Sequence, residues 1–116
     1  MALIDFHRSG IFHLLWKRKI RAFLDEKESF VKAEFFSARK CELGTWLYAE
    51  GLNTYGKIPE IIKLEEVHSE IHIAARKAMG FKESGDMGNA ELEYAKLDEN
   101  SKKLIHLLTS IGMIIN

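Results

Sequence analysis

The chain has little of several features that define other classes of protein. It has one cysteine, Cys41, so no intrachain disulfide can form and an oxidising compartment is not indicated. No apolar run approaches the roughly 20 residues that cross a bilayer, and the start of the chain lacks the charged-then-apolar order of a signal peptide. Neither sign of charge is in excess, since 17 basic and 17 acidic side chains give a formal net charge of zero. We therefore expect a cytoplasmic protein that binds neither membranes nor nucleic acid.

What is present indicates one folded domain. The 116 residues suit a single unit, which we take as residues 1–116. Hydrophobic residues make up 47% of the chain, which is enough for a core and too much for a disordered segment. Proline occurs once, at Pro59, and the eight glycines cluster mainly at 44–56 and 80–88, where breaks between elements are expected.

Apolar residues recur at helical rather than strand spacing. Phe6, His13 and Ile20 are seven apart and predict a helix over residues 3–25. Spacings of three and four predict a helix over 59–79, through the apolar line Ile61, Leu64, His68, Ile71, Ala75, Met79. A second apolar line predicts a last helix over 90–114, through Leu97, Leu104, Leu108, Ile111, Ile115. Residues 26–40 show no long period and are expected to form a loop with one helical turn.

Glycines and turn residues are expected to separate these helices. A short helix over residues 41–50 would stop at Gly51, with a loop over residues 53–57. Residues 80–88 would form a second break, with Asp86 or Asn89 as the N-cap of the last helix. Three long helices and a short one that carries the cysteine predict an all-α, antiparallel four-helix bundle.

Three of the five histidines are expected to face the core. His13 and His68 lie on the apolar lines of their helices, and His72 follows His68 by one turn on the same face. His106 should face water, because it is about 200° from Leu104 around the helix, whereas His7 is ambiguous. An inward histidine is often a hydrogen-bonded core residue, and that interpretation stays open here. The alternative is zinc, because three imidazoles and a thiol would be costly to bury without a partner.

Two other histidine motifs fit less well. The HExxH motif of zinc proteases needs glutamate directly after the first histidine, where this chain has Ser69 and places Glu70 on the opposite side of the helix. A di-iron, hemerythrin-like bundle needs carboxylates that project inward from several helices. Few are evident, so this remains a remote alternative.

Three separate elements resemble one known family. Cys41–Leu47 is similar to the C-x-[L/F]-G-x-W signature of the chemoreceptor zinc-binding (CZB) domain, with Leu43 where some members have phenylalanine. His13–Trp16 resembles its H-x-x-W element, and His68–His72 resembles its H-x-x-[apolar]-H element. The three elements occur in the family's order, and the resemblance covers residues from about 10 to 78.

The resemblance implies a four-helix bundle in which zinc is held by His13, Cys41, His68 and His72. His13 is preferred to His7 because Trp16 follows it at the spacing of the motif. A cysteine that opens a helix favours its thiolate form, which is the form that binds metal. Trp16 and Trp46 are expected to shield the site from water.

Four protein ligands would close a tetrahedral zinc site to substrate, so we expect a regulatory module rather than an enzyme. The resemblance implies sensing of zinc or oxidants in chemotaxis or cyclic-di-GMP signalling, with a homodimer and a signalling partner. A second hypothesis is a structural, zinc-stapled dimerisation bundle. The basic run Lys17–Arg21 could instead touch nucleic acid or anionic membrane, but the acids that follow it favour a solvated helix face.

Overall fold

The computed structural model describes residues 6–25 and 42–115, and this part of the chain is helical with short turns and no strand. The elements in chain order are α1 (Phe6–Leu24), α2 (Glu42–Trp46), the π-helical η2 (Leu47–Gly51), α3 (Leu52–Tyr55), α4 (Pro59–Glu83) and α5 (Met87–Ile115). The all-α prediction is confirmed for the described residues.

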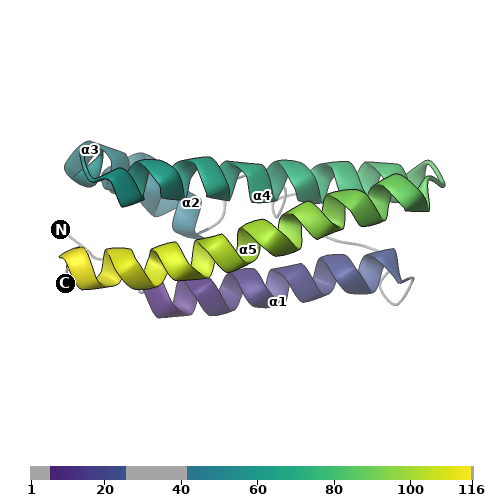
Figure 1. Cartoon of the computed structure of the whole chain (residues 1–116), viewed down its shortest axis with the longest axis horizontal. Helices are drawn as coiled ribbons and strands as arrows, with labels where there is room; N and C mark the ends of the chain where they lie inside the picture. The colour runs from purple at the N-terminus through teal and green to yellow at the C-terminus, as the bar shows by residue number, and fades with distance from the viewer. Residues whose placement is uncertain (1–5, 26–41, 116) are drawn as a thin grey trace.

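The three long helices lie along one another in an elongated molecule of 44 × 21 × 19 Å (Figure 1). The α4 and α5 helices form a hairpin, and α1 packs mainly against α5. Since α5 runs opposite to both α4 and α1, the amino-terminal part of α4 lies at the same end as the amino terminus of α1. The short α2, η2 and α3 elements lie at that end as well.

Local chemistry explains where α4 and α5 begin. Ile58 is extended, with φ −79° and ψ 123°, and Pro59 takes the first helical turn, where its missing N–H costs nothing. Glu60 adds an acidic side chain near the positive end of the helix dipole. The Asn89 backbone N–H donates to Asp86 Oδ1 at 3.2 Å, so Asp86 is the N-cap of α5, one of the two predicted residues.

Two glycine-based predictions are wrong. The chain does not leave the helical conformation at Gly51, which has φ −55° and ψ −52° and leads directly into α3. A Cβ on Gly51 would lie 2.8 Å from Trp46 Cζ3, so this glycine permits close packing rather than a turn. The predicted break at 80–88 is also too long, because α4 continues to Glu83 and only Gly85, with φ +84°, needs a left-handed backbone.

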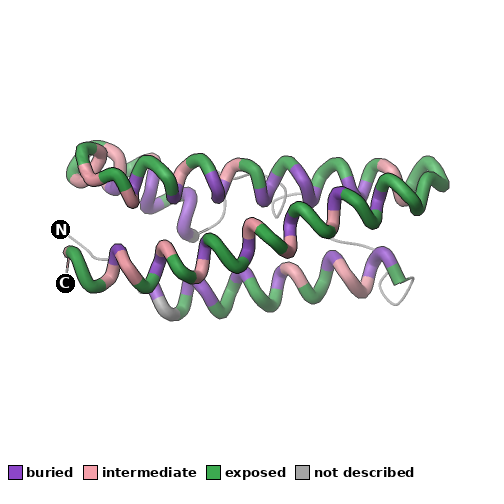
Figure 2. The backbone as a smooth tube through the Cα atoms, in the orientation of Figure 1, coloured by how far each residue is buried: buried purple, intermediate pink, exposed green. Residues whose placement is uncertain are grey.

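The predicted apolar lines form the core. Buried residues follow the inward side of each long helix, as Figure 2 shows. The predicted inward positions of α4 are all buried, and so are those of α5 except Ile115, which is partly buried. The periodicity in the sequence therefore identified the inward faces correctly.

Ion pairs fix α1 against α5 along their polar edge. Lys17 Nζ lies 2.6 Å from Asp98 Oδ1, and Arg21 makes a two-point contact with Glu91 at 2.6 and 2.7 Å. The Arg21 guanidinium also lies 4.7 Å from the centre of the Tyr94 ring. Two of the bases in the Lys17–Arg21 run therefore hold helices together, which supports the interpretation of a helix face rather than a nucleic-acid site.

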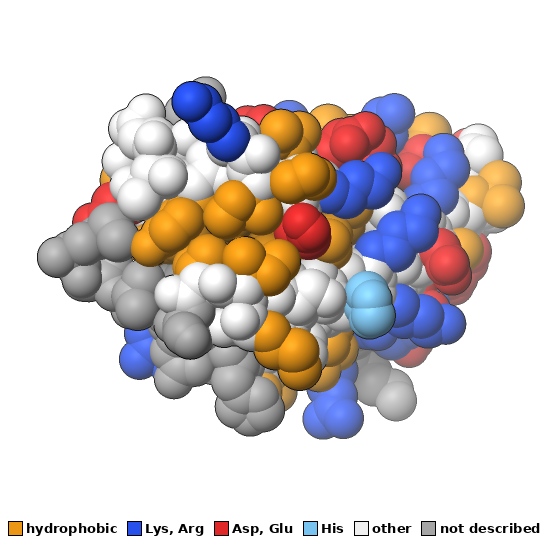
Figure 3. Space-filling model, turned by 60° about the vertical axis from the view of Figure 1, so that its left-hand side comes forward, with side chains coloured by type: hydrophobic (Ala, Val, Ile, Leu, Met, Phe, Trp, Pro, Cys, Tyr) orange, Lys and Arg blue, Asp and Glu red, His pale blue; other side chains and the backbone are white. Residues whose placement is uncertain are grey.

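The surface carries both signs of charge. Figure 3 shows basic and acidic side chains interspersed on the face that it draws, with hydrophobic side chains gathered toward one end. Among the described helices, none is long and apolar enough to cross a membrane.

Candidate metal centre

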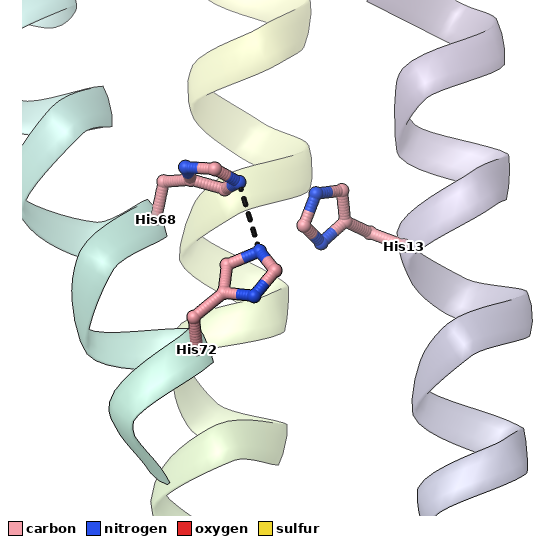
Figure 4. A group of neighbouring side chains, drawn as sticks. All are labelled: His13, His68 and His72. Atoms are coloured by element: carbon pink, nitrogen blue, oxygen red, sulfur yellow. Dashed lines mark hydrogen bonds between the residues drawn. The ribbon is translucent and has the colours of Figure 1, made fainter. Parts of the chain in front are cut away.

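Two long helices bring three histidines together. His68 and His72 lie one turn apart on the inward side of α4, and His13 points toward them from α1 (Figure 4). Their exposed fractions are 2%, 0% and 2% for His13, His68 and His72, so the predicted inward orientation is confirmed for all three.

The ring nitrogens are close enough to serve one ion. One nitrogen from each histidine lies within 4.8 Å of the others, and His68 Nε2 is 3.1 Å from His72 Nε2. Ligand atoms on a tetrahedral zinc ion, with Zn–N bonds of about 2.05 Å, lie about 3.3 Å apart. The three donors are therefore of the right type for zinc. To bind one ion, the donor atoms that are up to 4.8 Å apart would have to approach to about 3.3 Å.

The contact between His68 and His72 defines which tautomers the pair can adopt. A hydrogen bond between two Nε2 atoms needs a proton on one of them and a lone pair on the other. A metal would need the lone pair of each coordinating nitrogen. The hydrogen bond and metal binding through these two atoms are therefore alternatives.

Burial keeps His13 and His68 neutral. Burial, together with a smaller contribution from the neighbouring His72, lowers the pKa of His13 from 6.5 to about 3. Burial also lowers the pKa of His68, to about 2, with additional contributions from His13 and His72. Neutral imidazole is the form that binds a metal, so the environment prepares these groups as ligands.

Tryptophan shields one side of the cluster. The Trp16 ring is 4.8 Å from the His72 ring and 5.8 Å from the His13 ring, centre to centre, and its side chain is buried. The ring contacts of Trp46 are with Phe6, at 5.4 Å, and with Tyr55, at 6.3 Å. Trp16 therefore has the predicted shielding position, and Trp46 joins α1 to the short helices.

The remaining predicted residues have different outcomes. Cys41 lies outside the described residues, although α2 begins at the residue that follows it. The side chain of His7 is also outside the described part, and His106 is exposed as predicted. Glu70 is exposed, which agrees with its predicted position away from His68. Within the described helices, the metal-binding cluster contains no carboxylate, so nothing there supports a di-iron centre.

One contact near the site was not evident from the sequence. Tyr48 Oη and Ser69 Oγ are 3.5 Å apart, which connects η2 to α4 next to His68. Tyr48 reaches this position from a π-helical turn, and π-turns have no clear sequence signal. The short helical segment that follows Cys41 is thus attached directly to the helix of the histidine pair.

The comparison with known proteins agrees with this geometry. The family model of the chemoreceptor zinc-binding domain matches residues 13–79, more than half of the chain. The chain belongs to this family. The match includes His13, His68 and His72, so the CZB assignment and the histidine cluster point to the same zinc-binding function. No curated protein and no solved structure shows a significant match.

Membership of the CZB family shows what kind of protein this is. The CZB domain is a zinc-binding domain, and its family is sensory rather than a known family of enzymes. Chemoreceptor signalling is the context that fits the family, and the three clustered histidines can hold the metal ion.

Proposed function

We propose that this CZB domain is a sensory module that binds one zinc ion through His13, Cys41, His68 and His72. The observation that supports it most is the cluster of three buried histidines, whose donor atoms lie within 4.8 Å of one another. Cys41 comes directly before the first residue of α2, and η2, which follows α2, contacts α4 at Ser69, next to His68. A thiolate is the ligand that would complete a His₃Cys tetrahedral site.

The proposed ligand set leaves no position for a substrate. Catalytic zinc sites keep one position open for water, whereas structural sites fill all four with protein groups. We therefore propose that the domain is not an enzyme. We also propose that residues 1–116 form one cytoplasmic domain, an antiparallel four-helix bundle in which the short helix after Cys41 completes the metal centre.

Signalling would depend on how the helices are held. Bound zinc would cross-link α1, α4 and the start of α2. Without that cross-link, His13 would still contact α4 through its imidazole ring, whose centre is 5.1 Å from that of His68, but no coordinate bond would join the two helices. The position of α1 relative to α4 would then respond to zinc occupancy, which is the kind of two-state element that a sensor needs.

Oxidation is the second proposed signal. A sulfenic acid or a higher oxide at Cys41 would be a poorer ligand than thiolate, so an oxidant would weaken zinc binding.

A domain of this kind would act as a homodimer and would pass its zinc-bound or zinc-free state to a partner in chemotaxis or cyclic-di-GMP signalling. The alternative is a structural bundle in which zinc contributes only stability.

Zinc content tests the ligand set. We expect close to one zinc per chain in the wild type by elemental analysis, and a much lower content in Cys41→Ala and His72→Ala after dialysis against a weak chelator. His106→Ala is the matched control, because His106 is exposed and should leave the zinc content unchanged. A wild type that takes up no zinc at neutral pH under reducing conditions would refute the proposal.

A reversible change separates sensing from a structural role. If the domain is a sensor, the zinc-free chain should stay helical by circular dichroism and should regain its original fluorescence spectrum when zinc returns. A chain that simply unfolds without zinc would support the structural alternative.

A further inference from the structure

An open groove runs along the outer side of the α4–α5 hairpin. It encloses about 590 Å³ and is lined by residues of both helices, all within the described part of the chain. Ile73 and Ala74 lie midway along its α4 wall, and the Ile73 side chain is 46% exposed. The groove is on the opposite side of α4 from the histidines, because Glu70 in its wall is about 200° from His68 around the helix.

The groove carries four charges that have no ion-pair partner in the described part of the chain. Its α4 wall has Glu70 and Lys77, and its α5 wall has Glu99 and Lys103. None of these four takes part in an ion pair within residues 6–25 and 42–115, whereas Lys96 in the same groove pairs with Glu93 at 3.3 Å. Each wall therefore offers one acid and one base, and the four charges sum to zero.

We propose that this groove is the surface through which two copies of the chain associate. A two-fold axis in the interface, perpendicular to the helices, would place the α4 helices of the two copies antiparallel. Glu70 and Lys77 are seven residues apart, about 10.5 Å along the helix and on the same side of it. With the axis near Ile73, Glu70 of each copy meets Lys77 of the other, and the two Ile73 side chains meet between these pairs.

Charge complementarity favours a second copy over a partner of a single charge sign. An acidic partner would approach Glu70 and Glu99, and a basic partner would approach Lys77 and Lys103. A second copy in the antiparallel arrangement avoids both conflicts on α4 and covers Ile73. The inference rests on the homodimer that belongs to the proposed function, and it specifies the surface and the pairing.

Charge exchange tests the pairing directly. Sedimentation equilibrium on the zinc-loaded protein should show a wild-type dimer, and either Glu70→Lys or Lys77→Glu should raise the dimer dissociation constant about tenfold or more, because each change makes two contacts repulsive. The double variant Glu70→Lys/Lys77→Glu should restore dimerisation, since the exchanged charges again meet their opposites. Lys57→Glu is the matched control, because it makes the same change of charge at an exposed site in the turn before α4, outside the groove.

Several results would overturn the inference. These are a wild type that remains monomeric, single variants that dimerise as well as the wild type, or a double variant that fails to recover. Zinc content measured on the same samples keeps this test separate from the proposed function. Glu70 and Lys77 point away from the histidines, so their variants should keep wild-type zinc content whether or not they dimerise.

Discussion

Acid should destabilise the zinc-free protein through its buried histidines. The pKa of His13 is lowered to about 3 and that of His68 to about 2, whereas both would be about 6.5 in the unfolded chain. Below pH 6.5 the unfolded chain takes up protons that the folded chain refuses, so the free energy of unfolding falls as the pH falls. At and above neutral pH both states are unprotonated, and these groups then make the protein neither more nor less stable.

The size of the effect follows from the two pKa values of each group. Between about pH 7 and about pH 5.5, each histidine that stays neutral in the folded state lowers the free energy of unfolding by about 1.3 kcal/mol. His13 and His68 together give about 2.5 kcal/mol, a large part of the stability of a small domain. With a urea dependence of about 1.5 kcal/mol per molar, the urea midpoint should fall by roughly 1.7 M.

Urea unfolding followed by circular dichroism, with a chelator present at both pH values, measures this shift. His106→Gln should show the full shift, because His106 is exposed, and His68→Leu should show about half of it. An identical urea midpoint at the two pH values in the zinc-free wild type would show that the histidines are not held neutral by burial.

Two further substitutions test the packing. Gly51→Ala should lower the free energy of unfolding by about 1–2 kcal/mol, because the added Cβ would lie 2.8 Å from Trp46. Gly80→Ala is the control. It should raise the free energy of unfolding by about 0.5–1 kcal/mol, because Gly80 lies inside α4 and its added Cβ would meet nothing within 4 Å. Thermal melts of the two variants would show opposite shifts, and shifts of the same sign would contradict this account. Trp16→Ala should cost about 3–5 kcal/mol in a urea titration and weaken zinc retention, because it uncovers His72. Unchanged stability would show that Trp16 does not shield the centre.

The sequence predicted the long helices and the facing of the histidines well. Both depend on periodicity, and in this chain the apolar lines and the buried faces coincide. His13, His68 and His72 were placed inward for the same reason that Ile20 and Ile71 were. Their inward facing and the cost of burying them made a shared zinc ion one of two open interpretations, and the family resemblance then gave the ligand set. Periodicity alone says nothing of the distance between two helices.

The errors concern glycine and the short helices. Gly51 and Gly80 were interpreted as breaks, but a glycine in a packed helix is tolerated when neighbouring side chains fill the space or when the helix is long. Only the positive φ of Gly85 marks a real reversal, and sequence alone could not separate it from its neighbours. The π-helical turn that carries Tyr48 was also beyond prediction, because it arises from tertiary packing. Cys41 stays a prediction.

The order in which the contacts form follows from the topology of the hairpin. The α4 and α5 helices are joined by the three residues 84–86, so their packing closes a short loop and can form early. His13 and His68 belong to segments that are separated by positions 14–67 of the chain, and their approach closes a much longer loop. We therefore expect the histidine cluster to assemble late in folding, so that an ion captured there would stabilise the contact that is slowest to form.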